Sequence, residues 1–305
     1  MKKKILIVGG SGFLGFNLLL KLNKLKNFKI TAVSRNIPDY LKKFNKVNLI
    51  KADFSKYNSL SKSLKKKNYD IVINFGGNID HKNKLQTEQS HYKLCKNLID
   101  FFRDKKILFF LQAGSSLEYG RKKFPNEEKD KCKPDAIYGK SKLKSTEYIE
   151  KSGLNYIILR LYQIYGPYQK INRIIPLAIF NLKQFQYFQS SAGIQLRDFL
   201  YVDDLINLIL KILNTKKIKN GIFNVGEGKP ISIKQVLKKI EKKINFGKVQ
   251  FGKLKMRKDE PKVLFPSIKK VKKYYNWYPK IDLETGLRKT IYHYEKKNSI
   301  SKHSS

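Results

Sequence analysis

Cysteine, histidine and acidic residues are all scarce in this sequence of 305 residues. The two cysteines, Cys95 and Cys132, have neither paired nor CxxC spacing. They fit a reducing compartment and thiols that are buried or reactive, rather than a disulfide framework. The four histidines form no cluster with cysteines or carboxylates that has the spacing of a metal site, so we expect no metal.

Long apolar runs are absent as well. No segment approaches the ~18 consecutive apolar residues of a membrane-spanning helix, so we expect no membrane partner. The three lysines at positions 2–4, followed by an apolar run, could begin a signal peptide. Glycines interrupt that run, however, and no small-residue cleavage site closes it. We therefore expect a cytoplasmic protein.

The scarcity of acidic residues leaves a large positive charge. Against 24 Asp and Glu stand 65 Lys and Arg, a formal net charge of +41 at pH 7. Such an excess normally indicates nucleic acid or anionic lipid as a partner. The lysines are spread along the whole chain in short runs, as a general compositional bias would place them, with solvated head groups. A preference for anionic partners is the alternative, but small anionic ligands would satisfy it, and nucleic acid is not expected.

The first half of the chain alternates short apolar runs with longer amphipathic ones. This pattern is typical of βαβ units and of a parallel sheet covered by helices. Helices are expected to begin near Phe13, Tyr57, Lys84 and Asp135. Strands are expected at residues 4–8, 29–33, 47–51, 70–75, 106–111 and 155–159. Right-handed crossovers then produce an α/β fold, a doubly wound parallel Rossmann sheet.

After Gly166 the pattern loosens and predicts a smaller α/β lobe. Its expected elements are a helix over 174–182, a strand at 199–202, a helix capped by Asp203, a strand at 221–225, and helices from Ser232 and Leu283. We therefore divide the chain into three parts. These are an NAD(P)-binding Rossmann domain (1–166), a substrate-binding lobe (167–297) with some segments packing back on the Rossmann sheet, and a disordered tail (298–305).

A glycine-rich turn joins the first strand to the first helix. Gly9, Gly12 and Gly15 have GxxGxxG spacing. The first permits the tight turn, the second lets the backbone approach a pyrophosphate, and the third lets the helix pack closely on the strand. In this position the motif predicts a dinucleotide site, to which we also assign the adjacent Phe13 and Leu14.

The end of the second strand bears on which dinucleotide is bound. A carboxylate ~20 residues further on would bind the ribose 2′-hydroxyl of NAD. The sequence instead has Ser34 and Arg35, and no carboxylate until Asp39. A hydroxyl beside a guanidinium suits a 2′-phosphate, which favours NADP, with NAD as the alternative. Asp53 is placed either to accept a hydrogen bond from the adenine or to cap the next helix.

Tyr138 and Lys142 form a Tyr-x-x-x-Lys pair, which on a helix puts both side chains on one face. About 3 such pairs are expected from composition, and four occur, starting at Tyr92, Tyr119, Tyr138 and Tyr292. The pair alone is therefore weak evidence.

Ser115 distinguishes one of these pairs. It follows directly on the fifth predicted strand, 23 residues before Tyr138, and ligands of open α/β sheets bind beyond the carboxyl ends of the strands. Free tyrosine has a pKa of about 10, and an ammonium about 4 Å away stabilises its phenolate by about 4 kcal/mol at an effective dielectric constant of about 20. We predict Tyr138 as the acid/base of a hydride transfer at a carbinol, with Lys142 stabilising its phenolate and Ser115 bonding the reacting oxygen.

Together these residues resemble the extended short-chain dehydrogenase/reductase family, specifically the NAD-dependent epimerase/dehydratase group that acts on nucleotide sugars. The resemblance runs through residues 9–15, 53, 115–120, 138–142, 160–167, 197–204 and 277–279. It implies that Ser115, Tyr138 and Lys142 are catalytic and that Arg197 and Arg257 bind the substrate pyrophosphate. A homodimer formed through a four-helix face, to which helices 84–102 and 134–151 could contribute, is also implied. We further assign Phe54, Phe75 and Gly76 to cofactor binding and Ser116 to substrate binding.

Departures from the family pattern narrow the function. Ser116 and Leu117 stand where 4,6-dehydratases carry an acidic pair, so dehydration is not expected. Residues 74–77 read Asn-Phe-Gly-Gly instead of His-Leu-Ala-Ala, and His91 replaces the usual asparagine of the next helix. We interpret His91 as a polar contact rather than a catalytic base.

Two enzyme hypotheses remain, both acting at the sugar C4. Ser34 and Arg35 favour an NADPH-dependent 4-ketoreductase of a nucleotide 6-deoxysugar, because a reductase draws on a pool of reduced cofactor. The alternative is a nucleotide-sugar 4-epimerase with tightly bound NAD. A non-catalytic cofactor-sensing or nucleic-acid-associated protein would have no need to keep Ser115, Tyr138 and Lys142 together, although fold alone does not fix function.

Overall fold

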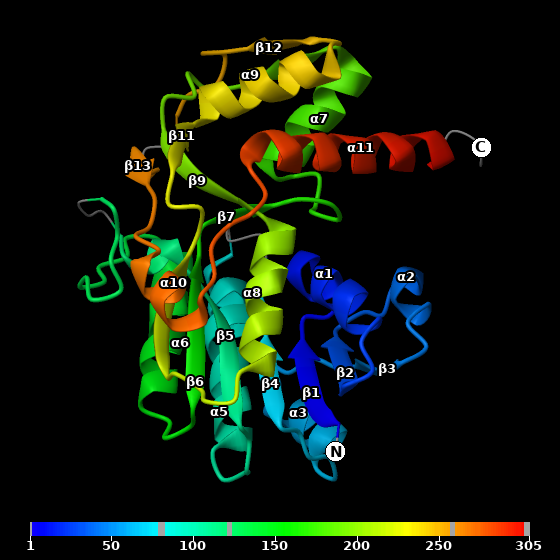
Figure 1. The fold of residues 1–305 in the computed structure, drawn as a ribbon, viewed down its shortest axis with the longest axis vertical. Coiled ribbons are helices and arrows are strands. Elements are labelled where there is room, and N and C mark those ends of the chain that lie inside the picture. Colours follow the sequence, from blue (N-terminus) through cyan, green and yellow to red (C-terminus); the bar gives the residue numbers. More distant parts are fainter. Residues whose placement is uncertain (1, 79–82, 121–123, 257–259, 302–305) are drawn as a thin grey trace. The chain divides into compact units, whose positions relative to one another are not determined.

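The computed structural model describes residues 2–78, 83–120, 124–256 and 260–301. The chain divides into two units (Figure 1). The first consists of Met1–Lys122, Glu128–Leu161 and Ile209–Asn224, and the second of Lys123–Glu127, Tyr162–Leu208 and Val225–Ser305. Residues 209–224 therefore return to the first unit beyond the boundary expected at residue 166.

The first unit is built on a seven-stranded sheet in the order β10-β6-β5-β4-β1-β2-β3. The six neighbouring strands β6, β5, β4, β1, β2 and β3 all run parallel to one another. This order, with one additional strand, is that of a doubly wound dinucleotide-binding sheet and confirms the expected fold class. The strands are β1 Lys3–Val8, β2 Phe28–Ser34, β3 Val47–Lys51, β4 Ile71–Asn74, β5 Phe109–Ser115, β6 Tyr156–Leu161 and β10 Gly221–Val225.

The helices of the first unit begin close to the expected positions. They are α1 Phe13–Leu22, α2 Asp39–Lys42, α3 Tyr57–Leu64, α4 Lys84–Glu88, α5 Leu94–Phe102 and α6 Ile137–Glu150. The long helix expected over 84–102 is not uniformly α-helical, because a π-helical turn, Gln89–Lys93, separates α4 from α5. Such turns are often found at functional sites.

Both faces of the sheet are buried. On one face, strand residues such as Leu6 and Phe110 pack in one cluster with residues of α3, α5 and α6, among them Leu98. Ile5 and Ile7, whose side chains alternate to the other face, are 0% exposed. Burial on both faces explains why these strands read as continuous apolar runs. Cys95 belongs to the same cluster and forms no disulfide.

The second unit contains a small sheet centred on β9. This strand pairs with β7 and β13 in parallel and with β11 antiparallel, while β8 and β12 form a separate parallel pair. The strands are β7 Gln163–Tyr165, β8 Tyr187–Gln189, β9 Leu196–Tyr201, β11 Pro230–Ser232, β12 Lys248–Gln250 and β13 Val263–Leu264. The helices are α7 Ile174–Phe185, α9 Ile233–Ile244, α10 Lys269–Tyr275 and α11 Leu283–Ser301. The boundary between the units falls within α8, Val202–Asn214.

One sequence prediction for this part of the chain is wrong. Asp203 does not cap α8 but lies in its first turn, where a carboxylate stabilises the helix dipole.

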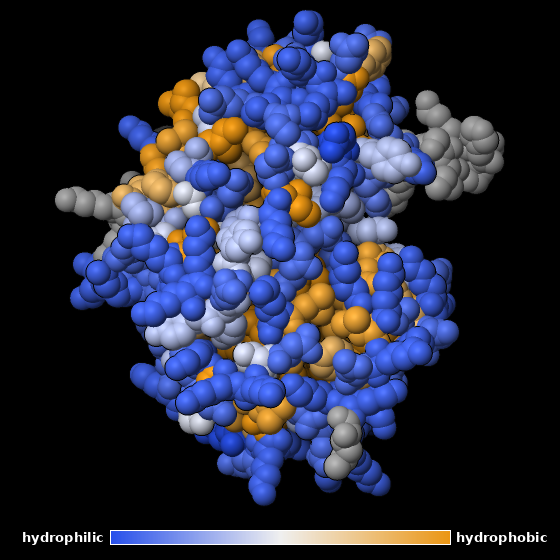
Figure 2. Space-filling model, in the orientation of Figure 1, coloured by the Kyte–Doolittle hydropathy of each residue, from blue (hydrophilic) through white to orange (hydrophobic). Residues whose placement is uncertain are grey.

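The chain's surface follows its composition. Hydrophilic side chains cover most of the face drawn in Figure 2, with scattered hydrophobic residues between them. No helix among the described residues is both long and apolar enough to cross a membrane.

Candidate active site

The glycine turn between β1 and α1 is closely packed. Gly9 has φ +84°, and its N–H donates to the Val33 carbonyl at 2.9 Å. A Cβ added to Gly9 would lie 2.9 Å from the backbone of Phe75, and one added to Gly15 would lie 2.3 Å from the Gly9 carbonyl oxygen. Both positions therefore require glycine, for the tight turn and for the close approach of helix and strand respectively.

The first turn of α1 offers backbone N–H groups to a ligand. Gly12 is the N-cap residue, no side chain caps the helix, and its first turn has no acidic residue. The N–H groups of Phe13 and Leu14 thus have no side-chain acceptor, and the helix dipole adds partial positive charge there. A Cβ on Gly12 would meet only the Gly9 carbonyl oxygen, at 3.2 Å. The turn therefore fits the pyrophosphate of a dinucleotide.

The end of β2 is tied to this turn. The Ser34 hydroxyl accepts a hydrogen bond from the Ser11 N–H at 2.9 Å, and the Tyr40 hydroxyl donates to the Ser11 carbonyl at 2.8 Å. Ser34 is buried, whereas the next residue, Arg35, is exposed. Ser34 thus shapes the turn and keeps its own O–H as a donor, with a guanidinium beside it.

The segment after β3 excludes one of the two roles expected for Asp53. The Asp53 carboxylate accepts from the N–H and the hydroxyl of Ser55, while α3 begins only at Tyr57, so Asp53 is not its cap. The Phe54 side chain is 1% exposed and belongs to the core. A cofactor could reach only the backbone of Phe54, whose carbonyl also accepts from the Asn97 side chain at 3.0 Å.

The loop after β4 explains two departures from the family pattern together. A Cβ on Gly77 would lie 2.3 Å from the imidazole ring of His91, so the histidine fills the space that a side chain at position 77 would need. His91 Nε2 also lies 3.1 Å from the Asn78 carbonyl oxygen. The N–H of Gly76 donates to the Asn74 side chain at 2.9 Å. His91 is thus part of the wall of this loop, consistent with a polar contact.

The structure brings the three predicted catalytic residues into neighbouring elements. Ser115 is the last residue of β5, and Tyr138 and Lys142 lie on α6. Lys142 is 5% exposed, donates from Nζ to the Ala113 carbonyl at 2.7 Å, and has its Nζ 5.9 Å from the centre of the Tyr138 ring. Lys142 thus brings a buried positive charge close to the Tyr138 ring.

Two further contacts place Tyr138. The His91 ring lies edge-on to the Tyr138 ring, with 4.9 Å between the centroids. A Cβ on Gly139 would lie 2.4 Å from the Leu117 carbonyl oxygen, so α6 packs directly on the 3-10 turn that follows β5, Ser116–Glu118. This close packing sets the helix carrying Tyr138 against the turn carrying Ser115.

Sequence reasoning missed Glu118, which holds that turn. The Ser115 hydroxyl accepts from the Leu117 N–H at 3.2 Å, and the Glu118 carboxylate accepts from the Ser115 N–H at 2.7 Å. The two bonds form a capping box. Its signal was present in the sequence, because Ser-x-x-Glu is the spacing of this motif.

The predicted substrate-binding residues have different surroundings. Ser116 is buried beside Ser115. In the second unit, taken by itself, Arg197 is buried, and its guanidinium lies 2.7 Å from the Glu260 carboxylate. Burial lowers the pKa of Arg197, and the neighbouring carboxylate opposes this shift. Arg257 lies outside the described residues.

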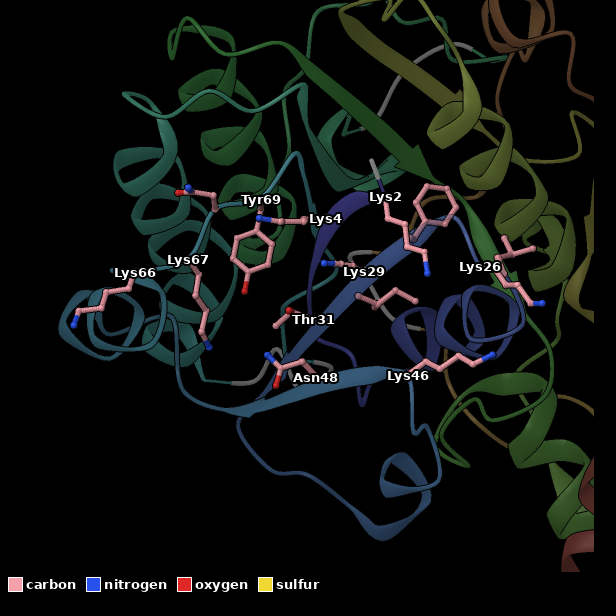
Figure 3. Close-up of a pocket in the computed structure, with 14 residues that line it drawn as sticks. Lys2, Lys4, Lys26, Lys29, Thr31, Lys46, Asn48, Lys66, Lys67 and Tyr69 are labelled. Atoms are coloured by element: carbon pink, nitrogen blue, oxygen red, sulfur yellow. The ribbon is translucent and has the colours of Figure 1, made fainter.

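A cavity of about 760 Å³ lies elsewhere, at the amino-terminal side of the sheet, and its lining includes seven lysines and no acidic residue (Figure 3). Lys4 and Lys29, which pair across β1 and β2, are among them. Within the described residues none of the seven forms an ion pair. Since the glycine turn follows the carboxyl end of β1, this cavity is separate from the dinucleotide site.

Comparison with known proteins agrees with this geometry. Residues 5–226 match the model of the NAD dependent epimerase/dehydratase family. A UDP-glucuronate 4-epimerase from Thermodesulfobacterium geofontis is 31% identical over 206 residues, 64% of this chain and 62% of the relative. A dTDP-4-dehydro-6-deoxyglucose reductase from Escherichia coli is 25% identical over 311 residues, 95% of this chain and 97% of the relative.

Solved structures show the same fold. A point mutant of the UDP-glucuronic acid 4-epimerase from Bacillus cereus, in complex with UDP-4-deoxy-4-fluoro-glucuronic acid and NAD, superposes with a TM-score of 0.87. It is 24% identical in sequence, and the match covers 96% of this chain and 99% of that one. Because the family model matches well over half of the chain, the protein belongs to the NAD dependent epimerase/dehydratase family and is an NAD(P)-dependent enzyme of the nucleotide-sugar epimerase, dehydratase and reductase type.

Proposed function

We propose that the protein transfers a hydride at the C4 carbinol or ketone of a nucleotide-activated sugar, with Tyr138 as the acid/base. The observation that carries this proposal is the buried Lys142 ammonium, 5.9 Å from the Tyr138 ring, on a helix packed against the turn that bears Ser115. These are the groups needed to move a proton at a carbinol oxygen.

Each residue has one role in the reaction. In the oxidation direction Tyr138, as the phenolate, takes the proton of the sugar hydroxyl, and in reduction it returns a proton to the oxygen. Lys142 stabilises the phenolate, and the Ser115 hydroxyl orients the reacting oxygen. When bound, the nicotinamide supplies or accepts the hydride. Ser116 and, from the second unit, Arg197 and Arg257 bind the nucleotide sugar.

The cofactor is placed by the elements at the carboxyl ends of the strands. The glycine turn and the first turn of α1 hold the pyrophosphate, Asp53 accepts from the adenine, and Phe75 and Gly76 line the nicotinamide side. Ser34 and Arg35 favour a 2′-phosphate. The preferred assignment is therefore an NADPH-dependent 4-ketoreductase of a nucleotide 6-deoxysugar, working as a cytoplasmic homodimer.

The second candidate is a nucleotide-sugar 4-epimerase with tightly bound NAD. It is favoured by relatives that are named 4-epimerases, such as the T. geofontis protein. The two candidates differ in how the cofactor is used, since an epimerase returns the hydride to the same sugar and a reductase releases the oxidised dinucleotide.

The test begins with the cofactor. The purified protein is denatured, any released dinucleotide is identified, and the empty protein is titrated with NADPH and NADH. A site that is empty and binds NADPH at least tenfold more tightly supports the ketoreductase, to be assayed with dTDP-4-dehydro-6-deoxyglucose. Stoichiometric release of NAD overturns it in favour of the epimerase, to be assayed with UDP-glucose and UDP-glucuronic acid. Binding of neither dinucleotide contradicts both.

A further inference from the structure

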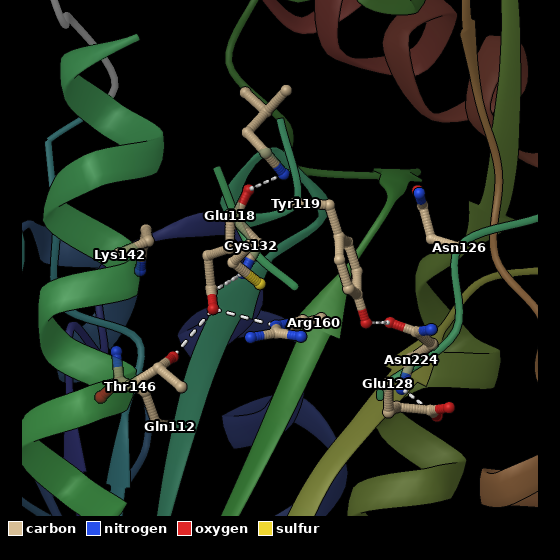
Figure 4. A network of polar contacts seen from close by, with 12 residues as sticks. Gln112, Glu118, Tyr119, Asn126, Glu128, Cys132, Lys142, Thr146, Arg160 and Asn224 are labelled. Atoms are coloured by element: carbon tan, nitrogen blue, oxygen red, sulfur yellow. Dashed lines mark hydrogen bonds and ion pairs between the residues drawn. The ribbon is translucent and has the colours of Figure 1, made fainter. Parts of the chain in front are cut away.

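Glu118 is a buried carboxylate directly beside the proposed catalytic centre (Figure 4). Its exposed fraction is 0%, and it accepts three hydrogen bonds. Oε1 accepts from the Ser115 N–H at 2.7 Å, and Oε2 accepts from the Thr146 hydroxyl at 2.8 Å and from Arg160 Nε at 2.9 Å. A charge removed from water this completely is stable only when it is paired and hydrogen-bonded.

The three donors come from three different elements. Ser115 ends β5, Thr146 lies on α6, and Arg160 lies on β6. The bond to Thr146 is the informative one, because Thr146 follows Lys142 by one helical turn and Tyr138 by two. One carboxylate group therefore joins the strand end that carries Ser115 to the helix that carries the acid/base.

The turn that Glu118 holds also engages the Ser115 hydroxyl. The hydroxyl oxygen accepts from the Leu117 N–H at 3.2 Å, in the capping box that Glu118 closes. A serine hydroxyl has one hydrogen to donate. With an acceptor site occupied by Leu117, that hydrogen remains as a donor for a substrate oxygen.

Arg160 keeps the network charge-neutral. Its guanidinium lies 4.4 Å from the centre of the Tyr119 ring, whose hydroxyl donates to the Asn224 side chain at 2.8 Å. Burial lowers the pKa of Arg160, but Glu118, Tyr119 and Cys132 together outweigh this and the net shift is upward, so the guanidinium stays charged. Glu118 can thus hold the turn without adding a net negative charge near Tyr138.

We propose that Glu118 is a positioning residue for proton transfer. Through its hydrogen bonds to Thr146 and to the Ser115 backbone, it keeps the Ser115 hydroxyl correctly placed relative to Tyr138 and Lys142. This inference rests on the proposed function, since it takes Ser115 and Tyr138 as the groups that act on the sugar oxygen. It predicts that removing the hydrogen bond between Thr146 and Glu118 slows turnover while leaving ligand binding intact.

The main test is Thr146→Val, which removes the hydroxyl at nearly constant volume and leaves all charges in place. Turnover is measured per dinucleotide-binding site, on whichever nucleotide sugar of the preceding section the wild type converts. We expect kcat to fall at least tenfold, with KM and the dinucleotide Kd within about threefold of wild type. Thr146→Ser, which keeps the hydroxyl, should restore kcat to within about threefold.

Thr290→Val is the matched control. Thr290 is equally buried, in α11, and its hydroxyl donates to the Gly286 carbonyl at 2.7 Å. We expect Thr290→Val to keep kcat per site within twofold of wild type, although it should lose about as much thermal stability as Thr146→Val. The inference is overturned if Thr146→Val keeps kcat within twofold, or if Thr290→Val loses as much.

Glu118→Gln gives a second, independent measurement. Its amide can still accept from Ser115 but presents N–H groups toward Arg160, which can only donate, and the Thr146 hydroxyl must turn to accept instead of donate. We expect a kcat loss at least as large as that of Thr146→Val, at unchanged dinucleotide stoichiometry. Tyr138→Phe separates the two proposals. If it retains wild-type turnover, the proposed function fails, and if it is inactive while Thr146→Val is not, only the positioning role fails.

Discussion

The two ends of the seven-stranded sheet differ in how they carry positive charge. At the carboxyl ends, Lys142 is 5% exposed and bonded to a backbone carbonyl, whereas Arg35, directly after β2, is exposed. At the amino ends, seven lysines line an open cavity without ion-pair partners among the described residues. We place the proposed chemistry at the carboxyl ends, beside the buried lysine.

The difference follows from solvation. An exposed lysine keeps its ammonium in water, where its interactions are screened and weak. A buried lysine acts on its neighbours through a lower dielectric, so one ammonium can stabilise a phenolate by several kcal/mol. The direction of the strands, rather than the density of lysines, therefore indicates where the protein works. Four variants test this comparison, and their expected effects decrease in the order given.

Tyr138→Phe should have the largest effect. Removing the proposed acid/base is expected to reduce kcat about 10²- to 10⁴-fold with little change in dinucleotide affinity. Tyr292→Phe is the matched control, because Lys296 Nζ lies 4.7 Å from the Tyr292 ring in another Tyr-x-x-x-Lys pair, on the exposed side of α11. Steady-state kinetics of both variants give the two losses in kcat. Equal losses would contradict the role of Tyr138 as the acid/base.

Gly15→Ala tests the close packing of the glycine turn. The new Cβ would lie 2.3 Å from the Gly9 carbonyl oxygen, so we expect a loss of about 3 kcal/mol in the free energy of unfolding and dinucleotide binding at least tenfold weaker. Gly153→Ala is the control. Its Cβ would meet nothing within 4 Å, and its φ of +77° alone should cost about 1 kcal/mol. Wild-type affinity in Gly15→Ala, measured by titration, would show that the turn does not hold the pyrophosphate.

Arg35→Ala should have a smaller and more selective effect. An exposed guanidinium that binds a 2′-phosphate contributes about 1.4 kcal/mol, or tenfold in Kd. We expect NADPH affinity to fall about tenfold while NADH affinity, the internal control, changes by less than twofold. Equal changes for both dinucleotides would mean that Arg35 does not recognise the phosphate, and would favour the epimerase.

Much of the carboxyl end could be predicted because its signals are local. Apolar runs located the strands, and β3 has the bounds that the pattern predicted. The end of β5 could not be predicted in this way, because Gly114 and Ser115 continue the strand only through pairing with Arg160 and Leu161 of β6. The contacts of Glu118 with Thr146 and Arg160 join residues 28 and 42 positions apart. No local pattern indicates these two contacts. The Ser-x-x-Glu spacing indicates only the contact between Ser115 and Glu118.

The double variant Lys29→Gln, Lys46→Gln should have the smallest effect, and it tests the other half of the comparison. Both lysines line the cavity at the amino ends and are exposed. Exposed charges of this kind contribute less than about 0.5 kcal/mol each, and removing two like charges relieves some repulsion. We expect kcat, KM and dinucleotide Kd within twofold of wild type and an equal or slightly higher melting temperature. A tenfold loss of activity would instead place a functional anion contact at the amino ends, and strand direction would no longer separate the two regions.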